Sequence, residues 1–133
     1  MSNIFHCAVL GGDLAVAENF YVNVLGCKKD NFEEGRWMDI DFWGNELTLH
    51  SSESRAPREH HDVDMGSVPV PHFGIHLPKD IFNSVKKSLA DNNVPFLDEP
   101  YIRFAGTAYE QETFFIEDTN FNVIEIKTLV DTK

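Results

Sequence analysis

The sequence predicts an α+β protein in which the order β-α-β-β-β occurs twice. Strand-like and helix-like segments follow one another in this order in each half of the 133-residue chain. His6 and His72 are 66 positions apart, and the expected helix caps Asp13 and Asp80 are 67 positions apart. A nearly constant offset of this kind is typical of a duplicated structural unit.

The first half begins with a strand over residues 4–10. Asp13 is a suitable N-cap for a helix, because its short side chain can accept hydrogen bonds from the first free amides. Apolar residues then recur at helical spacing as far as Leu25, and Gly26 is a typical helix terminator. Three strands are expected to follow, over residues 27–32, 36–43 and 46–51.

The second half repeats the pattern, with a strand over residues 71–77 and a helix capped by Asp80. Three strands follow, over residues 96–104, 112–118 and 122–130. The segment 51–71 is rich in Ser, Pro, His and charge, and a long connection of this kind links units or covers a site. We expect one domain over residues 1–133, made of module 1 (about 1–51), a linker (about 52–70) and module 2 (about 71–133).

The composition is that of a globular protein, with 42% hydrophobic and 25% charged residues. No apolar run approaches the ~20 residues that a membrane-spanning helix needs, and no signal peptide is visible. The formal net charge of −11 argues against nucleic acid as a partner, because its phosphates would be repelled. Cys7 and Cys27 are interpreted as buried thiols rather than a disulfide or metal knuckle, so we expect a cytoplasmic protein.

Six histidines are the first candidates for chemistry. We expect His60 and His61 in a solvated loop and His76 in a structural role at a strand end. Three others lie in strands among apolar neighbours: His6, His50 and His72. A single histidine of this kind is usually a hydrogen-bonded core residue, but His6 and His72 occupy matching positions of the repeated unit.

Glu125 lies in a strand whose other residues are mostly apolar. A buried carboxylate is costly unless it is paired or bound to a metal. The alternative is a strand with one wet face, on which Val123, Glu125 and Lys127 alternate outward. Two imidazoles and one carboxylate with open positions form the ligand set of non-haem Fe(II) oxygenases. His6, His72 and Glu125 therefore suggest a metal site.

Four segments carry a resemblance to a known family: FHCAV at 5–9, FYVNVLGC at 20–27, PHFG at 71–74 and FIEDTNFNVIE at 115–125. They resemble the vicinal oxygen chelate superfamily, which includes glyoxalase I, bleomycin- and fosfomycin-resistance proteins and type I extradiol dioxygenases. The match spans both halves of the chain. The resemblance implies two paired βαβββ modules that form a cupped mixed sheet around a metal ion, in a single vicinal-oxygen-chelate domain.

Carried over residue by residue, the resemblance places metal ligands at His6, His72 and Glu125. Glyoxalase I has a fourth ligand, for which the string Glu46-Leu47-Thr48 suggests Glu46, whereas matching the two modules suggests Thr48. We favour three ligands, with Glu46 and His50 lining the cavity, because Glu46, Thr48 and His50 share one strand face. His50 is predicted to be an acid/base, with a fourth ligand or a histidine at the wet end of the strand as alternatives.

Residues 36–44, 99–104 and 109–115 resemble a group labelled extradiol-dioxygenase-related. This implies a metal-dependent, dioxygenase-like oxidoreductase acting on a small substrate with vicinal oxygens. We expect Tyr101 and Arg103 to contact an oxyanion or carboxylate of the substrate or, alternatively, to form an exposed strand end. The resemblance implies one divalent ion, Fe(II) being favoured over Mn, Ni or Zn, and a homodimer. The alternatives are a glyoxalase-like lyase or isomerase, a resistance-type transferase, and a metal-free protein that binds a drug or metabolite.

Overall fold

The computed structural model describes residues 3–63 and 66–129. The chain forms two compact units. Unit 1 consists of Met1–Ala56 and Asp118–Asn122, and unit 2 consists of Pro57–Glu117 and Val123–Lys133. None of the helices in the described part of the chain is long and apolar enough to cross a membrane.

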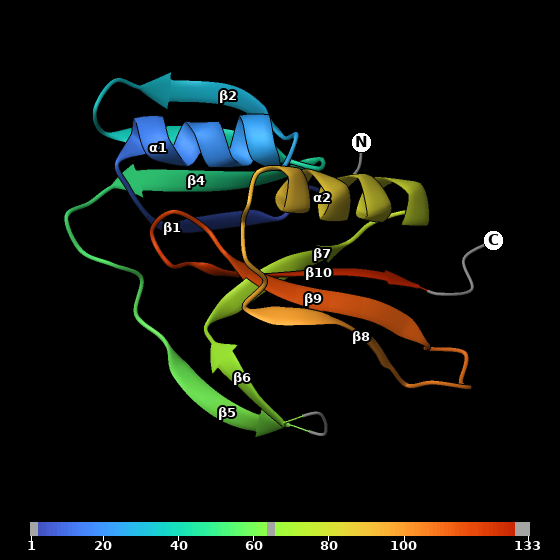
Figure 1. Cartoon of the computed structure of the whole chain (residues 1–133). Helices are drawn as coiled ribbons and strands as arrows, with labels where there is room; N and C mark the ends of the chain where they lie inside the picture. Colours follow the sequence, from blue (N-terminus) through green and yellow to red (C-terminus); the bar gives the residue numbers. More distant parts are fainter. Residues whose placement is uncertain (1–2, 64–65, 130–133) are drawn as a thin grey trace. The chain divides into compact units, whose positions relative to one another are not determined.

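Unit 1 is a βαβββ module (Figure 1). Its elements are β1 (His6–Gly12), α1 (Leu14–Glu18), the π-helical segment η1 (Asn19–Val24), β2 (Lys28–Glu33), β3 (Trp37–Phe42) and β4 (Asn45–Ser51). The strand order in the sheet is β1-β4-β3-β2, in which β1 runs parallel to β4 and the other pairs are antiparallel. The order of elements predicted for the first half is therefore confirmed.

The helix of unit 1 begins as predicted, because the Asp13 side chain accepts hydrogen bonds from the amides of Ala15 and Val16. Its second part differs from a regular α-helix. The Leu25 amide donates to the Phe20 carbonyl, five residues earlier. This is the hydrogen bond of a π-helix, and the neighbouring rings of Phe20 and Tyr21 in this segment are both buried. Apolar periodicity alone does not distinguish the two helix types, so the π-helical turn was not predicted.

The sheet of unit 1 has one apolar and one polar face. Met38, Ile40 and Phe42 on β3 are buried, and so are Leu47 and Leu49 on β4. Since side chains alternate between the faces of a strand, the intervening residues of β4 lie together on the opposite face. That face carries Glu46, Thr48 and His50, as the period of two predicts.

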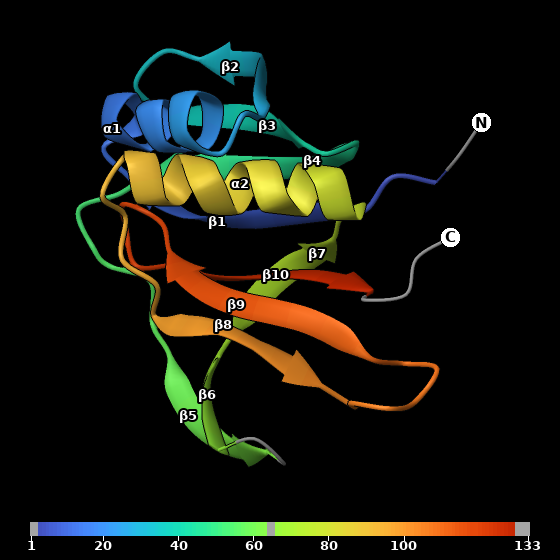
Figure 2. The same ribbon diagram turned by 45° about the vertical axis from the view of Figure 1, so that its right-hand side comes forward.

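Unit 2 repeats the module after a hairpin (Figure 2). Its elements are β5 (Glu59–Val63), β6 (Gly66–Val70), β7 (His72–His76), α2 (Lys79–Asp91), β8 (Asp98–Arg103), β9 (Gln111–Glu117) and β10 (Val123–Leu129). The strand order β7-β10-β9-β8 matches that of unit 1, with β7 parallel to β10. The α+β class with two βαβββ modules is therefore confirmed.

Helix α2 covers one face of this sheet. It buries Phe82, Val85 and Leu89, and the Phe82 ring lies 5.2 Å from the Phe114 ring on β9. Pro78 rather than Asp80 is at the cap position, and Asp80 lies in the first turn, where its charge is favourable beside the helix N-terminus. The cap position predicted for this helix was therefore wrong by two residues.

The connecting segment also differs from the expected loop, because β5 and β6 pair as an antiparallel hairpin. His60 and His61 are exposed, but they lie on β5. Val63, Val68 and Val70 favour the extended conformation over this stretch. The polar composition of β5 concealed the hairpin, since all five of its residues are exposed and no apolar alternation marks that strand.

The five residues between β9 and β10 belong to unit 1. The buried Asp118 carboxylate accepts hydrogen bonds from the Asn120 and Asn122 amides and, at 2.6 Å, from the Tyr21 hydroxyl. The side-chain amides of Asn120 and Asn122 donate to the Leu10 carbonyl. Burial raises the pKa of Asp118 and, well above its usual value, the pKa of Tyr21. This buried network ties residues about a hundred positions apart into one unit.

Candidate metal centre

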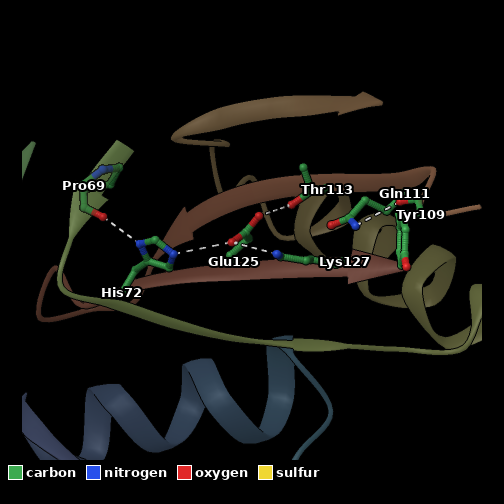
Figure 3. A network of polar contacts seen from close by, with 7 residues as sticks. All are labelled: Pro69, His72, Tyr109, Gln111, Thr113, Glu125 and Lys127. Atoms are coloured by element: carbon green, nitrogen blue, oxygen red, sulfur yellow. Dashed lines mark hydrogen bonds and ion pairs between the residues drawn. The ribbon is translucent and has the colours of Figure 1, made fainter. Parts of the chain in front are cut away.

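His72 and Glu125 meet on the face of the unit 2 sheet that α2 does not cover (Figure 3). His72 Nε2 lies 3.5 Å from Glu125 Oε1, and the Glu125 side chain is only 7% exposed. Strands β7 and β10 approach closely here because Gly74 is paired with Glu125. A Cβ atom at Gly74 would overlap the Glu125 carbonyl, so this position needs glycine.

The surroundings of His72 define which of its two ring nitrogens is available to bind a metal ion. Nδ1 lies 2.7 Å from the Pro69 carbonyl oxygen. A carbonyl only accepts, so Nδ1 carries the hydrogen, and in the neutral ring Nε2 presents a lone pair toward Glu125. The Phe115 ring packs edge-on against His72 at 5.2 Å. Such outer contacts orient metal-binding histidines in proteins.

The buried Glu125 carboxylate is satisfied by two neighbours on the same face. Thr113 donates its hydroxyl hydrogen to Oε2 at 2.7 Å, and Lys127 Nζ lies 3.5 Å from Oε1. Oε1 is therefore the oxygen that faces both His72 and Lys127. Val123 and Glu125 are both buried, so β10 does not have the wet face on which Val123, Glu125 and Lys127 would alternate outward.

The donor pair matches the spacing that a divalent ion requires. An ion with nitrogen and oxygen ligands at about 2.0–2.2 Å has neighbouring ligand atoms about 2.8–3.6 Å apart, from octahedral to tetrahedral geometry. The Nε2–Oε1 distance of 3.5 Å lies within this range. In the described part of the chain, no three His, Cys, Asp or Glu side chains form a group that could hold a metal ion. Among its described residues, unit 2 thus offers two ligands and no third.

His6 has a different partner in unit 1. Its Nδ1 lies 2.7 Å from Glu46 Oε1, and both side chains are about half exposed. The strand register explains this pair, because His6 on β1 is opposite Glu46 on β4. As in His72, Nδ1 is the bonded nitrogen. His6 is the one remaining residue of the predicted ligand set, and it lies in the other unit.

The register also bears on the choice between Glu46 and Thr48. Glu125 lies opposite Gly74, two residues after His72, and the equivalent residue in unit 1 is opposite Ala8, two residues after His6. That residue is Thr48, which donates a hydrogen bond to Asp39 at 2.6 Å. Position therefore equates Thr48 with Glu125, while Glu46 is the carboxylate in contact with His6.

The structure does not bring His50 to His6. His50 is opposite Leu10 and lies four residues beyond Glu46 on β4, which corresponds to about 13 Å along the strand. It is exposed, on the same face as Glu46. Tyr101 and Arg103 of β8 lie opposite Thr113 and Gln111 of β9, so both share the face that carries Glu125.

Sequence reasoning assigned no functional role to four residues of this face. Thr113 and Lys127 contact Glu125 directly. Gln111 is buried on β9, and His76 is paired with Lys127 in the register. Burial, followed by the charge of Lys127, lowers the pKa of His76. Alternation along β9 and β10 is the signal that points to Thr113 and Lys127, since both share the face of Glu125.

No protein-family model and no curated protein matches the chain. Solved structures do. A glyoxalase/bleomycin resistance protein/dioxygenase from Alicyclobacillus acidocaldarius is 34% identical, with a TM-score of 0.79 over 98% of this chain and 93% of that one. Lactoylglutathione lyase from Agrobacterium tumefaciens is 18% identical (TM-score 0.66, covering 96% and 94%). The fosfomycin resistance protein FosX from Listeria monocytogenes is 12% identical (TM-score 0.69, 96% and 93%). The last two share the fold. The identity and coverage of the first show that this chain belongs to the glyoxalase/bleomycin resistance protein/dioxygenase family.

Proposed function

We propose that this protein is a metal-dependent enzyme that acts on a small substrate with two adjacent oxygens. In this proposal His72 and Glu125 bind one divalent ion, and His6 is the third protein ligand. The observation that carries the proposal is the His72–Glu125 pair, whose Nε2 and Oε1 atoms are separated by 3.5 Å, a ligand–ligand spacing.

The neighbouring residues prepare these two ligands. The Pro69 carbonyl holds the Nδ1 hydrogen and so directs the Nε2 lone pair toward Glu125. Thr113 donates to Oε2 and leaves Oε1 as the carboxylate oxygen that faces the cation. A neutral imidazole and an ionised carboxylate are the protonation states in which these groups bind metals.

When bound, a divalent ion supplies Lewis acidity and a template for two adjacent substrate oxygens. Within the family, we infer an extradiol-dioxygenase-related oxidoreductase with Fe(II) as the favoured ion. Tyr101 and Arg103 share the face of Glu125, which supports their proposed role as substrate contacts. Glu46 is proposed to line the substrate cavity, and His50 stays a predicted acid/base.

The metal content of the purified protein tests the proposal. We expect roughly one divalent ion per chain by mass spectrometry after reloading and gel filtration, and loss of most of it in His72→Ala and Glu125→Ala. His60→Ala is the matched control, because His60 is exposed on β5. Full metal retention in the single alanine variants of His6, His72 and Glu125 would refute the ligand assignment. Oxygen uptake by the Fe(II)-loaded protein with catechols tests the dioxygenase assignment.

A second candidate function is supported by Lys127. Its ammonium lies 3.5 Å from Glu125 Oε1, so the carboxylate has a cationic partner without any metal. This favours a metal-free protein that binds a drug or metabolite. Calorimetric titration with Zn²⁺ and Mn²⁺ separates the two candidates, since no heat of binding for either ion would favour the binding protein.

We further propose that the two units form one vicinal-oxygen-chelate domain and that the protein is a cytoplasmic homodimer. In such a dimer, His6 comes from the same chain or from the second copy. Sedimentation equilibrium tests the assembly against the chain mass of 15.2 kDa. A single species of that mass at high protein concentration would contradict the dimer.

A further inference from the structure

Lys127 takes an unusual position for a lysine. It lies on β10 opposite Thr113 on β9 and His76 on β7, and its side chain is only 24% exposed. Lysine side chains usually extend toward water to keep the ammonium solvated. This side chain instead lies along the sheet toward Glu125, as Figure 3 shows. The fold therefore holds a positive charge beside the proposed metal ligands.

The contact between Lys127 and Glu125 is loose. The distance of 3.5 Å from Nζ to Oε1 exceeds the about 2.7–2.9 Å of a charge-assisted hydrogen bond. An ammonium has three hydrogens to donate. Since Oε1 is also the oxygen proposed to bind the ion, a bound cation would compete with the ammonium for the same negative charge. Lys127 would then need another anion beside it.

Gln111 places a hydrogen-bond acceptor on the same face. The residue is 7% exposed, and its Nε2 donates to the Tyr109 carbonyl at 3.2 Å. That contact defines the orientation of the Gln111 side-chain amide, because the Tyr109 carbonyl oxygen can accept a hydrogen bond only from the amide nitrogen. Oε1 is buried and has no hydrogen-bond partner among the described residues, and Figure 3 shows it turned toward Thr113 and Lys127. A buried acceptor in this state is open to a donor from a ligand.

We propose that Lys127 and Gln111 select a small 2-hydroxycarboxylate as the substrate class of this site. The Lys127 ammonium binds the carboxylate, and Gln111 Oε1 accepts the hydrogen of the hydroxyl group. A 2-hydroxycarboxylate also carries two adjacent oxygens, so the inference rests on the proposed function. It narrows the substrate class to anions that also carry a hydroxyl group as a hydrogen-bond donor. The proposed metal ligands, His72 and Glu125, present no group that would distinguish such an anion from a neutral diol.

The test uses three matched ligands: lactate, propionate, which lacks the hydroxyl, and lactamide, which lacks the charge. Binding is measured by NMR chemical-shift titration of the Zn²⁺-loaded protein. We expect lactate to bind best. Lys127→Met should weaken the binding of lactate roughly 10-fold or more, which is the scale of one charge-assisted contact, and leave the binding of lactamide unchanged. Gln111→Leu should weaken the binding of lactate and leave the binding of propionate unchanged. Lys86→Met is the control, because Lys86 pairs with Glu112 instead.

An experiment without metal separates this inference from the proposed function. Glu125→Gln removes the negative partner of Lys127, so the metal-free variant should bind lactate more tightly than the metal-free wild type. Lys127→Met in the Glu125→Gln background should abolish that gain. Equal lactate binding with and without Lys127, or lactamide binding as tightly as lactate, would overturn the inference. If the proposed function fails, the protein does not bind Zn²⁺. Lactate binding by the metal-free variants with and without Lys127 then still decides whether Lys127 binds the carboxylate.

Discussion

The contact between Tyr21 and Asp118 leads to a quantitative prediction for Tyr21→Phe. Tyr21 is fully buried, and its hydroxyl donates to Asp118 Oδ2 at 2.6 Å. The substitution deletes one oxygen and leaves the ring packing intact. The carboxylate keeps three other donors: the amides of Asn120 and Asn122 and the side-chain nitrogen of Asn122. The effect therefore isolates one hydrogen bond to a buried charge.

Its magnitude follows from the charge of the acceptor. A hydrogen bond to a charged group contributes about 1.5–3 kcal/mol to the free energy of unfolding. For a chain of this length, that loss corresponds to a fall in Tm of about 5–15 °C. Tyr109→Phe is the matched control, because Tyr109 is 73% exposed and the same change there should cost less than about 0.5 kcal/mol.

The pH dependence gives a second, independent check. Burial raises the pKa of Asp118 above 3.8, while the Tyr21 hydrogen bond acts to lower it. The folded carboxyl thus holds its proton to higher pH than the unfolded one, and stability from this group is lost as pH rises from about 3.8 to the folded pKa. Without the Tyr21 hydrogen bond the pKa of Asp118 is higher and this loss is larger. The difference in free energy of unfolding between wild type and Tyr21→Phe should therefore shrink in acid.

At alkaline pH the phenol itself contributes. Burial, then the charge of Asp118, raises the pKa of Tyr21 well above 10. The stability from the protonated phenol of Tyr21 is fully present below pH 10 and is lost above it, and only the wild type has a phenol at this position. Urea unfolding followed by circular dichroism from pH 3 to 11 should show the largest difference near neutral pH. An equal free energy of unfolding for the two proteins at pH 7, or a difference that does not change with pH, would refute this reasoning.

Three further predictions concern the site and the core. Gly74→Ala should push β7 away from Glu125 and reduce both the Tm and the metal content, measured by calorimetry and mass spectrometry; a stable, fully loaded variant would contradict the close approach. His50→Gln should retain the metal and, if His50 is the acid/base, lower turnover roughly 10²- to 10⁴-fold; unchanged turnover would assign His50 to the exposed strand end. Burial raises the pKa of Cys27 to about 12, so iodoacetamide at pH 8 should label it at the rate of global unfolding, and rapid labelling in the native protein would disagree.

Much of the fold follows from short-range signals in the sequence. Asp13 caps the first helix, apolar alternation marks β3 and β4, and the repeat offset pairs the two modules. The cap and the alternation depend on neighbouring residues, whose preferences the backbone obeys locally, whereas the repeat offset compares the two halves of the chain. The same signals placed His72 and Glu125 in strands and put Glu46 and His50 on one face.

Strand pairing decided which site residues face one another across strands, because register joins segments that are far apart in the chain. It set Gly74 against Glu125, His6 against Glu46 and His76 against Lys127. The alternation of a strand says which face a side chain shares, but the cross-strand neighbour depends on hydrogen bonds to a segment about 40–50 residues away. Alternation along β10 already puts Lys127 and Glu125 on one face, whereas the hydrogen bond from Thr113 to Glu125 was decided by tertiary structure, since only the paired sheet brings β9 beside β10.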